Sequence, residues 1–483
     1  MNVLISDIRQ ARREISFTGR QSCRVLPALL LIILSSLAAA ACFSIPGSVA
    51  TVAASAGFPG NAALCWIDDL VEEAIREKRL PGAVILIGQN ERILYRKAFG
   101  HRALVPDLEP MTVDTVFDLA SLTKVVATAT SIMMLVEAGR ISMEDPVTVY
   151  IPSFKRHGKS EITVRHLLTH MSGLRSGINP ARRWKGYRAA IEQIVNDVPL
   201  TPPGERIVYS DVNFILLGEI VQRVSGMPLD QFAQEHIFEP LGMHDSMYHP
   251  GPKMHSRIAP TDRCRKSTRP CGGPDSTMLR GVVHVPCGRR MGGSPGHAGL
   301  FSMADDLSVF CRMLLGGGTS RSALIISPAS LAGMISPSTP LDKGYLRALG
   351  WSLDTTFNER REKRSSLPIE HSGFTGTKLW LDIETGLYIV FLSNRLHPDG
   401  KGDVFDLREQ IITIAVSVAA DQATPAELST KVDTPNLRSL NLSTGKYQPR
   451  AQVLSGLDVL RAEAFIRMRG QKIGLLTNQT GQA

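Results

Sequence analysis

The stretch Ser121-Leu-Thr-Lys-Val-Val-Ala-Thr-Ala-Thr-Ser-Ile-Met-Met-Leu-Val-Glu-Ala138 decides the fold, because a start with three polar residues among four precedes a strongly apolar run. Its length predicts a helix, and the apolar side chains on all sides indicate that this helix is buried. Gly139 follows as a suitable C-terminal cap. Residues three apart share one face of a helix, so Ser121 and Lys124 are expected to lie side by side at the first turn.

Strands are predicted on both sides of this helix. The predicted elements are a helix at 67–78, strands at 83–88 and 93–95, a helix at 212–224, and strands at 378–382 and 387–392. Pro81-Gly82 precedes the first strand, Asp211 is a candidate N-cap of the helix, and Glu384-Thr-Gly386 joins the last two strands into a hairpin. Strands at both ends with helices between them predict an α+β domain over residues 60–420.

The N-terminal residues 1–50 have the layout of an export signal, a signal peptide or a membrane anchor. Arginines precede a nearly continuous apolar run from Val25 to Phe43, and small residues follow it. The run is long enough to span a bilayer, so three outcomes stay open: cleavage near Ala50, lipidation at Cys42, or retention as an anchor. In each case we expect the rest of the chain to be exported, either into the periplasm or anchored facing it.

The composition is that of an ordinary globular protein. The 483 residues are 43% hydrophobic and 20% charged, which excludes a disordered chain and a membrane protein with many spans. The net charge of +9 is spread along the chain and lies partly in the leader, so no nucleic-acid partner is expected. Among the seven cysteines, Cys264 and Cys271 are near enough in sequence for a loop disulfide, and free thiols are the alternative.

The serine and the lysine at this spacing suit nucleophilic catalysis. A serine hydroxyl is a poor nucleophile at neutral pH and needs a nearby base and donors for the developing oxyanion. Burial disfavours the charged form of Lys124, which would let its amine act as that base. Alone the pair is a weak signal, since a capping serine and a lysine that reaches to solvent look the same. Two further motifs, Tyr209-Ser-Asp211 and His371-Ser-Gly373, precede the predicted helix and hairpin.

Together the three motifs resemble, in order and spacing, those of the class C β-lactamase, penicillin-binding protein and esterase superfamily. The similarity extends over residues 64–418 and includes the segments 163–174 and 296–302. It implies a β-lactamase/transpeptidase-like fold, with an antiparallel sheet flanked by helices and a helical subdomain. It also implies a serine hydrolase that acts on a small-molecule substrate and needs neither a metal ion nor an organic cofactor.

The resemblance gives each motif residue a role. Ser121 would be acylated, Lys124 would take its proton, and Tyr209 would pass a proton to the leaving group. The oxyanion hole would consist of the backbone N–H groups of Ser121 and Phe374, the residue that follows His371-Ser372-Gly373.

Two positions depart from the pattern of the β-lactamases. Asp211 stands where they usually have asparagine, and an ionised carboxylate accepts hydrogen bonds but cannot donate them. A substrate role and a helix N-cap are both open for it. His371 replaces the lysine that meets the carboxylate of a β-lactam or of D-alanine. Because histidine is only partly charged at neutral pH, carboxylate binding would be weaker, which favours esterases and amidases.

Other residues near these motifs have alternative interpretations. We expect His166, His170 and His297 to pack or form loop hydrogen bonds rather than bind a metal, since they fall in segments characteristic of the superfamily. The segment Val282-Val-His-Val-Pro-Cys-Gly288 differs from that of close relatives, which usually have aspartate after the histidine. Because of this difference, a second interpretation of another class stays open, in which the protein is catalytically inactive and binds muropeptides.

The C-terminal residues indicate a substrate. A polar linker is predicted at 421–450, and residues 451–483 resemble the opening of the exo-β-N-acetylmuramidase family, as a truncated fragment too short to bury a core. The segments 371–376 and 392–398 resemble the serine amidases found beside that family. The resemblance therefore implies an N-acetylmuramyl-L-alanine amidase, with a general esterase and a D-alanyl-D-alanine carboxypeptidase or β-lactamase as alternatives.

Overall fold

A computed structural model describes residues 60–179, 183–264, 277–320, 323–340, 346–354 and 367–422. The predicted leader and the C-terminal fragment lie outside these residues. So does the predicted linker, apart from its first two residues, which belong to the helix α14 (Phe405–Gln422). Cys264 is disulfide-bonded, while its predicted partner Cys271 lies outside the described residues.

A seven-stranded sheet forms the centre of the described domain, in the order β3-β2-β1-β11-β10-β9-β8, and every neighbouring pair of strands is antiparallel. Its strands are β1 (Gly82–Gln89), β2 (Arg92–Ala103), β3 (Glu109–Pro110), β8 (Ser352–Leu353), β9 (Ile369–Ser372), β10 (Lys378–Asp382) and β11 (Leu387–Ser393). Two small sheets pair β4 (Phe117–Asp118) with β5 (Phe301–Ser302) and β6 (Thr319–Ser320) with β7 (Ala323–Leu324). The predicted hairpin is confirmed as β10 and β11.

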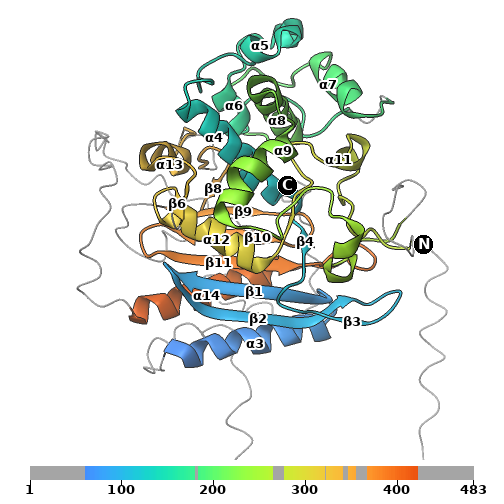
Figure 1. Cartoon of the computed structure of the whole chain (residues 1–483), viewed down its shortest axis with the longest axis vertical. Coiled ribbons are helices and arrows are strands. Elements are labelled where there is room, and N and C mark those ends of the chain that lie inside the picture. The colour runs from blue at the N-terminus through green and yellow to red at the C-terminus, as the bar shows by residue number, and fades with distance from the viewer. Residues whose placement is uncertain are drawn as a thin grey trace, which may run out of the picture. The chain divides into compact units, whose positions relative to one another are not determined.

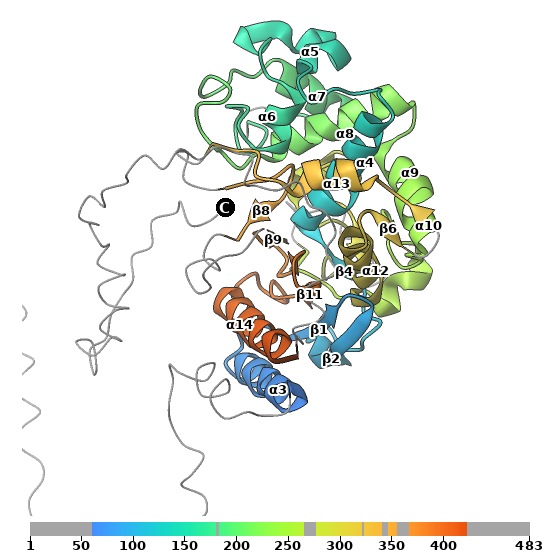
Figure 2. The ribbon, with the colours of Figure 1, turned by 90° about the vertical axis from the view of Figure 1, so that its left-hand side faces the viewer.

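Side chains of the central strands alternate between two cores. In β1, Val84 and Leu86 contribute to one core, and Ile85 and Ile87 contribute to the other. Because successive residues of a strand face opposite sides, a strand that is apolar throughout must be covered on both faces. The helices α3 (Gly60–Arg76) and α14 lie side by side over one face, as Figures 1 and 2 show.

The other face carries most of the helices. These are η2 (Ala120–Leu122), η3 (Lys124–Ala129), α4 (Thr130–Glu137), α5 (Val147–Tyr150), η4 (Pro152–Gly158), α6 (Val164–Leu168), α7 (Tyr187–Val195), α8 (Asp211–Ser225), α9 (Leu229–Ala233), η5 (Gln234–Phe238), α10 (Glu239–Leu241), η6 (Pro252–Arg257), α11 (Pro286–Arg290), α12 (Ala304–Leu315) and α13 (Pro328–Ile335). In Figure 1, the helices α4 to α9 stand together above the sheet. An antiparallel sheet with helices on both faces and a helical part on one side confirms the predicted fold class.

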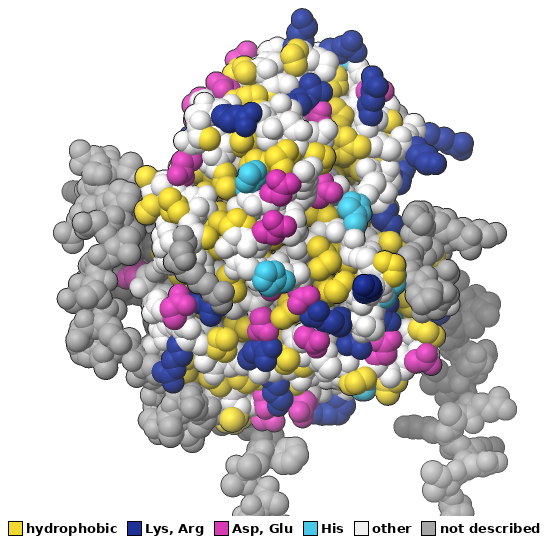
Figure 3. Space-filling view, viewed as in Figure 1, with side chains coloured by type: hydrophobic (Ala, Val, Ile, Leu, Met, Phe, Trp, Pro, Cys, Tyr) yellow, Lys and Arg dark blue, Asp and Glu magenta, His cyan; other side chains and the backbone are white. Residues whose placement is uncertain are grey.

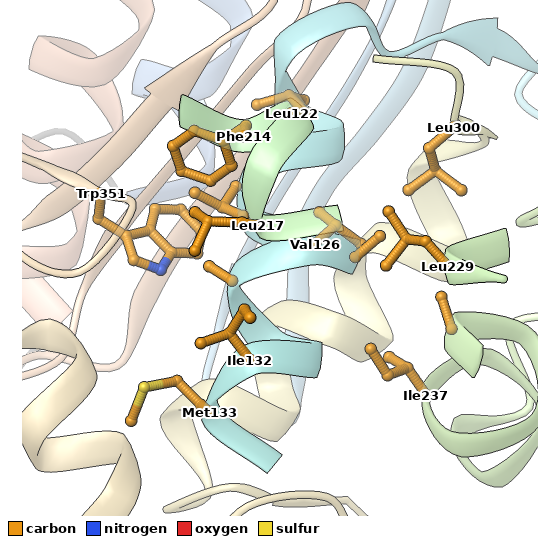
Figure 4. Packing of buried hydrophobic residues seen from close by; sticks show 14 of the residues in the cluster. Leu122, Val126, Ile132, Met133, Phe214, Leu217, Leu229, Ile237, Leu300 and Trp351 are labelled. Atoms are coloured by element: carbon orange, nitrogen blue, oxygen red, sulfur yellow. The ribbon is translucent and has the colours of Figure 1, made fainter. Parts of the chain in front are cut away.

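The predicted buried helix is present, but only its second half is α-helical. A 3-10 turn, η2, leads into the π-helical η3 and then into α4. Figure 4 shows Val126, Ile132 and Met133 of this segment packed among Phe214 and Leu217 of α8 and other apolar side chains. Among the described residues it is the one helical stretch long and apolar enough to cross a membrane, yet 78% of it is buried in the domain, so it is a core helix.

Candidate active site

Ser121 lies in a strained turn between a strand and the buried helix. β4 ends at Asp118, and Ala120 has a φ of +47°, a left-handed conformation that residues with a Cβ rarely adopt. Ser121 then occupies the middle of the 3-10 turn. The α-helical first turn expected from the sequence is therefore wrong in type. Lys124 is the first residue of the π-helical η3, and its Nζ lies 3.0 Å from Ser121 Oγ, so the two side chains meet as expected.

The ammonium of Lys124 is fully buried and donates three hydrogen bonds. Its Nζ lies 3.0 Å from Ser121 Oγ, 2.8 Å from Asp211 Oδ1 and 3.1 Å from the carbonyl oxygen of His297. Burial acts most strongly and disfavours the charge, but Asp211 and the phenolate form of Tyr209 outweigh it, so the pKa of Lys124 is raised. The expectation that burial alone makes Lys124 a neutral base is therefore wrong, because a carboxylate lies beside it.

Asp211 is the ion-pair partner of this lysine and does not cap the helix. Ser210 is the N-cap of α8, and its hydroxyl accepts the N–H of Asn213, which corrects the predicted cap. The N–H of Ser210 in turn donates to Nδ1 of His170 at 3.0 Å, so the start of α8 is held in place. Burial acts to raise the pKa of Asp211, but the Lys124 ammonium outweighs it and the pKa is lowered. The pair is charged at neutral pH.

The ring of Tyr209 is surrounded by two histidines and two cations. Its centroid lies 4.5 Å from that of His170 and 6.2 Å from that of His371. Lys124 Nζ lies 4.9 Å from the ring centroid, and the guanidinium carbon of Arg347 lies 6.0 Å from it. The structure thus brings the three predicted catalytic side chains together and adds an arginine that the sequence motifs do not contain.

His371, in β9, is neutral. It is buried, and this burial, followed by the charges of Arg347 and Lys124, lowers its pKa well below the ordinary value. The expected partial charge at neutral pH is corrected by this environment. Its Nδ1 lies 3.1 Å from the carbonyl oxygen of Ser372, whose own side chain is exposed at the end of the strand. The third motif therefore brings no positive charge to the site.

The turn after this strand is pressed against the serine turn. Gly373 donates its N–H to the carbonyl of Thr377, and a Cβ on Gly373 would clash with the Thr377 hydroxyl and with the carbonyl oxygen of Leu119. Only glycine allows this close approach. Among the hydrogen bonds of the described residues, none uses the N–H of Ser121 or of Phe374 as a donor. Both groups are free to meet a substrate oxygen, as the predicted oxyanion hole requires.

The segment 282–288 forms one wall of the site. The N–H of His284 donates to Asp118 Oδ2 at 2.6 Å. The ring of His284 stacks on the ring of Phe374 with centroids 5.7 Å apart, and the guanidinium of Arg395 lies 5.0 Å from the same ring. Phe374 is 58% exposed, so an apolar surface of fixed orientation faces solvent beside the oxyanion donors.

Sequence reasoning missed two charged residues of the site, Asp118 and Arg347. Arg347 is buried, its terminal nitrogens donate to the carbonyl of Gly350 and the hydroxyl of Ser352, and its Nε has no partner. Burial lowers the pKa of Arg347 to about 10, so it keeps its charge at neutral pH. Both residues stand inside apolar runs of the sequence, and that context was the available signal, because a charged residue is rarely buried without a reason.

The three histidines considered as metal ligands have other environments. His166 forms a capping box with Thr163 at the start of α6. His170 packs on Tyr209, and the ring of His297 is buried, with neither ring nitrogen hydrogen-bonded within the described residues. Among the described residues, no group of three His, Cys, Asp or Glu side chains is arranged to hold a metal ion.

Comparisons with known proteins agree with this geometry. The sequence profile of the beta-lactamase family matches residues 67–411. An N-acetylmuramyl-L-alanine amidase of Bacillus subtilis is 29% identical, over 70% of this chain and 84% of its own length. A protein of Escherichia coli named "Putative D-alanyl-D-alanine carboxypeptidase" is 30% identical, over 69% of this chain and 81% of its own length.

A solved structure shares the fold. The penicillin-binding protein homologue of Caulobacter crescentus superimposes with a TM-score of 0.59 at 22% identity, over 74% of this chain and 97% of its own. The family match covers more than half of the present chain, and its motifs form one site in the structure. The chain therefore belongs to the beta-lactamase family and is one of its serine hydrolases.

Proposed function

We propose that this hydrolase cleaves the amide between N-acetylmuramic acid and L-alanine in muropeptides. The neutral, buried His371 carries this proposal. In a D-alanyl-D-alanine peptide or a β-lactam, a free carboxylate lies next to the bond that is cleaved, and a fixed positive charge is suited to meet it. The carboxyl of the L-alanine in a muropeptide continues into the peptide, so no carboxylate needs a partner there. The amidase of B. subtilis among the relatives supports the same substrate.

The reaction would proceed through an acyl-enzyme on Ser121. The substrate carbonyl oxygen would accept the N–H groups of Ser121 and Phe374. The Ser121 Oγ would attack the carbonyl carbon of the lactyl group while its proton passes to the neutral amine of Lys124. The C–N bond would then break, with Tyr209 delivering a proton to the leaving amine of L-alanine and receiving in turn the proton that Lys124 took from Ser121. Water would hydrolyse the ester, which releases the muramyl carboxylate and restores the serine.

The resting ion pair sets the pH dependence of this scheme. Asp211 raises the pKa of Lys124, so most molecules hold a protonated lysine at neutral pH. Only the deprotonated amine can accept the serine proton. We therefore expect the acylation rate to rise with pH through the neutral range.

Purified protein incubated with three substrates tests the proposal, beside a Ser121→Ala control. The substrates are muramyl dipeptide, an N-acylated D-alanyl-D-alanine peptide and p-nitrophenyl acetate. Release of free N-acetylmuramic acid and dipeptide, absent from the control, is the expected result. Ester turnover with intact muramyl dipeptide would instead indicate a general esterase.

A D-alanyl-D-alanine carboxypeptidase is the second candidate. Arg347 favours it, because its guanidinium keeps a fixed charge near Tyr209 and His371, and the relative in E. coli bears that name. Release of D-alanine in the same assay would establish it. A protein that only binds muropeptides would give no adduct on the Ser121 peptide after treatment with a fluorophosphonate.

We also propose that the protein is exported, on the basis of the apolar run in residues 1–50. The expected partner remains a small molecule rather than a nucleic acid: on the face drawn in Figure 3, acidic and basic side chains are interspersed over the half that contains the sheet. Cell fractionation should find the protein in the periplasm or at the outer face of the membrane. Full-length protein free in the cytosol would contradict the export proposal.

A further inference from the structure

Asp118 is a buried carboxylate whose two oxygens each accept a backbone N–H. Oδ1 accepts the N–H of Ala120 at 2.9 Å, and Oδ2 accepts the N–H of His284 at 2.6 Å. Only 2% of the residue is exposed. The positive charge of Arg289, on α11, acts on this carboxylate and lowers its pKa. The guanidinium of Arg289 donates to the carbonyls of Val283 and His284. The two backbone donors hold this buried carboxylate in place, so a shift of the carboxylate would also shift the backbone at Ala120 and His284.

The bond to Ala120 closes the strained turn that presents Ser121. A left-handed φ at an alanine is disfavoured, so surrounding contacts must hold it. A side-chain oxygen of Asp that accepts the N–H two residues later is a common way to fix a turn. In this chain the residue after the turn is the predicted nucleophile, and its N–H is one of the two predicted oxyanion donors.

The backbone of the same segment holds the other oxyanion donor. The hydroxyl of Thr375 donates to the carbonyl of Asp118 at 2.7 Å, and the hydroxyl of Thr377 donates to the carbonyl of Leu119 at 3.1 Å. Phe374 stands in the turn that these two threonines fasten. Asp118 and Leu119 therefore connect three parts of the site, which are the serine turn, the 282–288 loop and the turn that carries the Phe374 N–H.

We propose that Asp118 is a positioning residue, which sets the distance between the Ser121 hydroxyl and the two oxyanion donors without touching the substrate. The proposal rests on Ser121 as the nucleophile of the proposed function, but on no particular substrate. Both carboxylate oxygens must act as acceptors. An asparagine offers one acceptor and one N–H donor, so one of the two backbone N–H groups would face another donor.

The charge of Asp118 gives the proposal a pH signature. Burial raises its pKa to about 6, against the backbone bonds and Arg289, which lower it. The ring of His284 has a pKa of about 4 and is neutral above pH 5. Lys124, on the segment that follows, pairs with Asp211, and β5 and the turn 373–377 contribute no ionisable side chain. Below about pH 6, a protonated Asp118 keeps only one full acceptor, so the site loosens.

Stability should change in the opposite direction. The pKa of Asp118 in the folded protein lies above the value of about 3.9 in an unfolded chain. The folded state therefore binds more protons between pH 4 and pH 6, and this group adds to stability as the pH falls through that window. Acylation should thus decrease where the contribution of Asp118 to stability increases, a combination that a merely structural residue does not produce.

Asp306 on α12 offers a matched control. It is also buried, its pKa is also raised to about 6, and it accepts the N–H of Asp245 at 2.8 Å and the hydroxyl of Ser246 at 2.9 Å. Asp118→Asn and Asp306→Asn should remove similar slopes of stability against pH between 4 and 6. The two variants should therefore have similar stability profiles and differ only in the reactivity of Ser121.

The experiment measures the rate of fluorophosphonate labelling of Ser121, the unfolding free energy, and amide hydrogen exchange at Ala120 and His284, from pH 4 to 8. Asp118→Asn should slow labelling at pH 7.5 by at least about tenfold, since small misplacements of reacting groups are costly, and should speed exchange at both amides. Asp306→Asn should change labelling less than about twofold. Wild-type labelling should fall more steeply below pH 6 than that of Asp118→Asn.

A second variant keeps the test decisive if Asp118→Asn folds poorly. Ala120→Gly in the Asp118→Asn background should recover part of the labelling rate, because glycine adopts a positive φ without the missing bond. Unchanged labelling and unchanged exchange in folded Asp118→Asn would overturn the proposal, as would an equal loss in Asp306→Asn. If wild-type Ser121 is not labelled at all, the proposed function fails, while exchange at Ala120 and His284 still decides the role of Asp118.

Discussion

Two fully buried lysines of this domain have pKa values shifted in opposite directions. Lys124 donates to the carboxylate of Asp211, and its pKa is raised. Lys159, at the end of η4, is equally inaccessible, and its pKa is lowered to about 8, mainly by burial. Its acceptors are backbone carbonyls at the C-terminal end of α7, those of Ile194, Val195 and Asp197, at 3.1, 2.7 and 2.6 Å.

The difference shows that burial does not decide the charge of a lysine. Carbonyl dipoles at the end of a helix favour a cation, but by less than a full negative charge at the same distance. Lys159 closes the end of α7 and serves the fold. Lys124 serves the site, and the acid beside it decides how much of it is neutral.

Replacing each lysine by methionine should separate the two roles most clearly. Lys124→Met removes the proposed base, so we expect fluorophosphonate labelling of Ser121 to slow by about a thousandfold. Lys159→Met, which lies in another part of the domain, should label at nearly the wild-type rate. A Lys124→Met variant within tenfold of wild type would show that another group accepts the serine proton.

The stability of the same variants should show the converse. Lys159→Met leaves carbonyls at the end of α7 without their donor, and we expect the unfolding free energy in urea to fall by about 2 kcal/mol at pH 7. The folded pKa of about 8 lies below that of an unfolded lysine, so the unfolded chain binds more protons between pH 8 and 10. Wild-type stability should receive a contribution that rises with pH in this window. Its persistence in Lys159→Met would exclude Lys159 as the source.

Asp211→Asn should make the environment of Lys124 resemble that of Lys159. With a neutral amide as partner, burial dominates, the pKa of Lys124 falls, and more of the amine is neutral at pH 7. We expect labelling at pH 7 to rise about tenfold, with the pH profile displaced to lower pH. Glu219→Gln, on the same helix but paired with Arg223, is the control and should leave the profile unchanged. An unmoved profile in Asp211→Asn would mean that the ion pair does not limit the base.

His371→Lys would place a further lysine at a buried position, this time among cations. Arg347 and Lys124 already act on position 371 and disfavour a positive charge there. We therefore expect acylation by a penicillin to change by less than about threefold, although a well-placed charge would be worth more. A larger gain would show that position 371 reaches the carboxylate of the β-lactam despite its neighbours.

The sequence pattern predicted the elements with strongly apolar or alternating residues. The predicted runs at 83–88 and 387–392 agree with β1 and β11 to within one residue at each end. The strand predicted at 93–95 is the much longer β2, because charged and exposed residues along β2 hide its strand character. The order of apolar and polar residues did not predict the π-helical and 3-10 parts of the buried helix, since these depend on how the chain enters the helix.

The site was predictable only as far as local motifs extend. Ser121, Lys124 and Tyr209 follow from their motifs and lie together in the structure. The effect of Asp211 on the lysine, and the presence of Asp118 and Arg347, depend on contacts between segments far apart in the chain. A sequence pattern records what a residue is, whereas a pKa depends on which distant group packs against it.

The pairing at the centre of the sheet has a consequence for synthesis. Ala83 of β1 pairs with Ser393 of β11, so the central strands come from opposite ends of the described domain. Such non-local contacts form late and slowly. While a ribosome is still making the chain, β1 has no partner on its β11 side, and the sheet cannot close until nearly the whole domain has emerged. A nascent chain kept open in this way can still be threaded through an export channel, which unfolded polypeptides pass and folded domains do not.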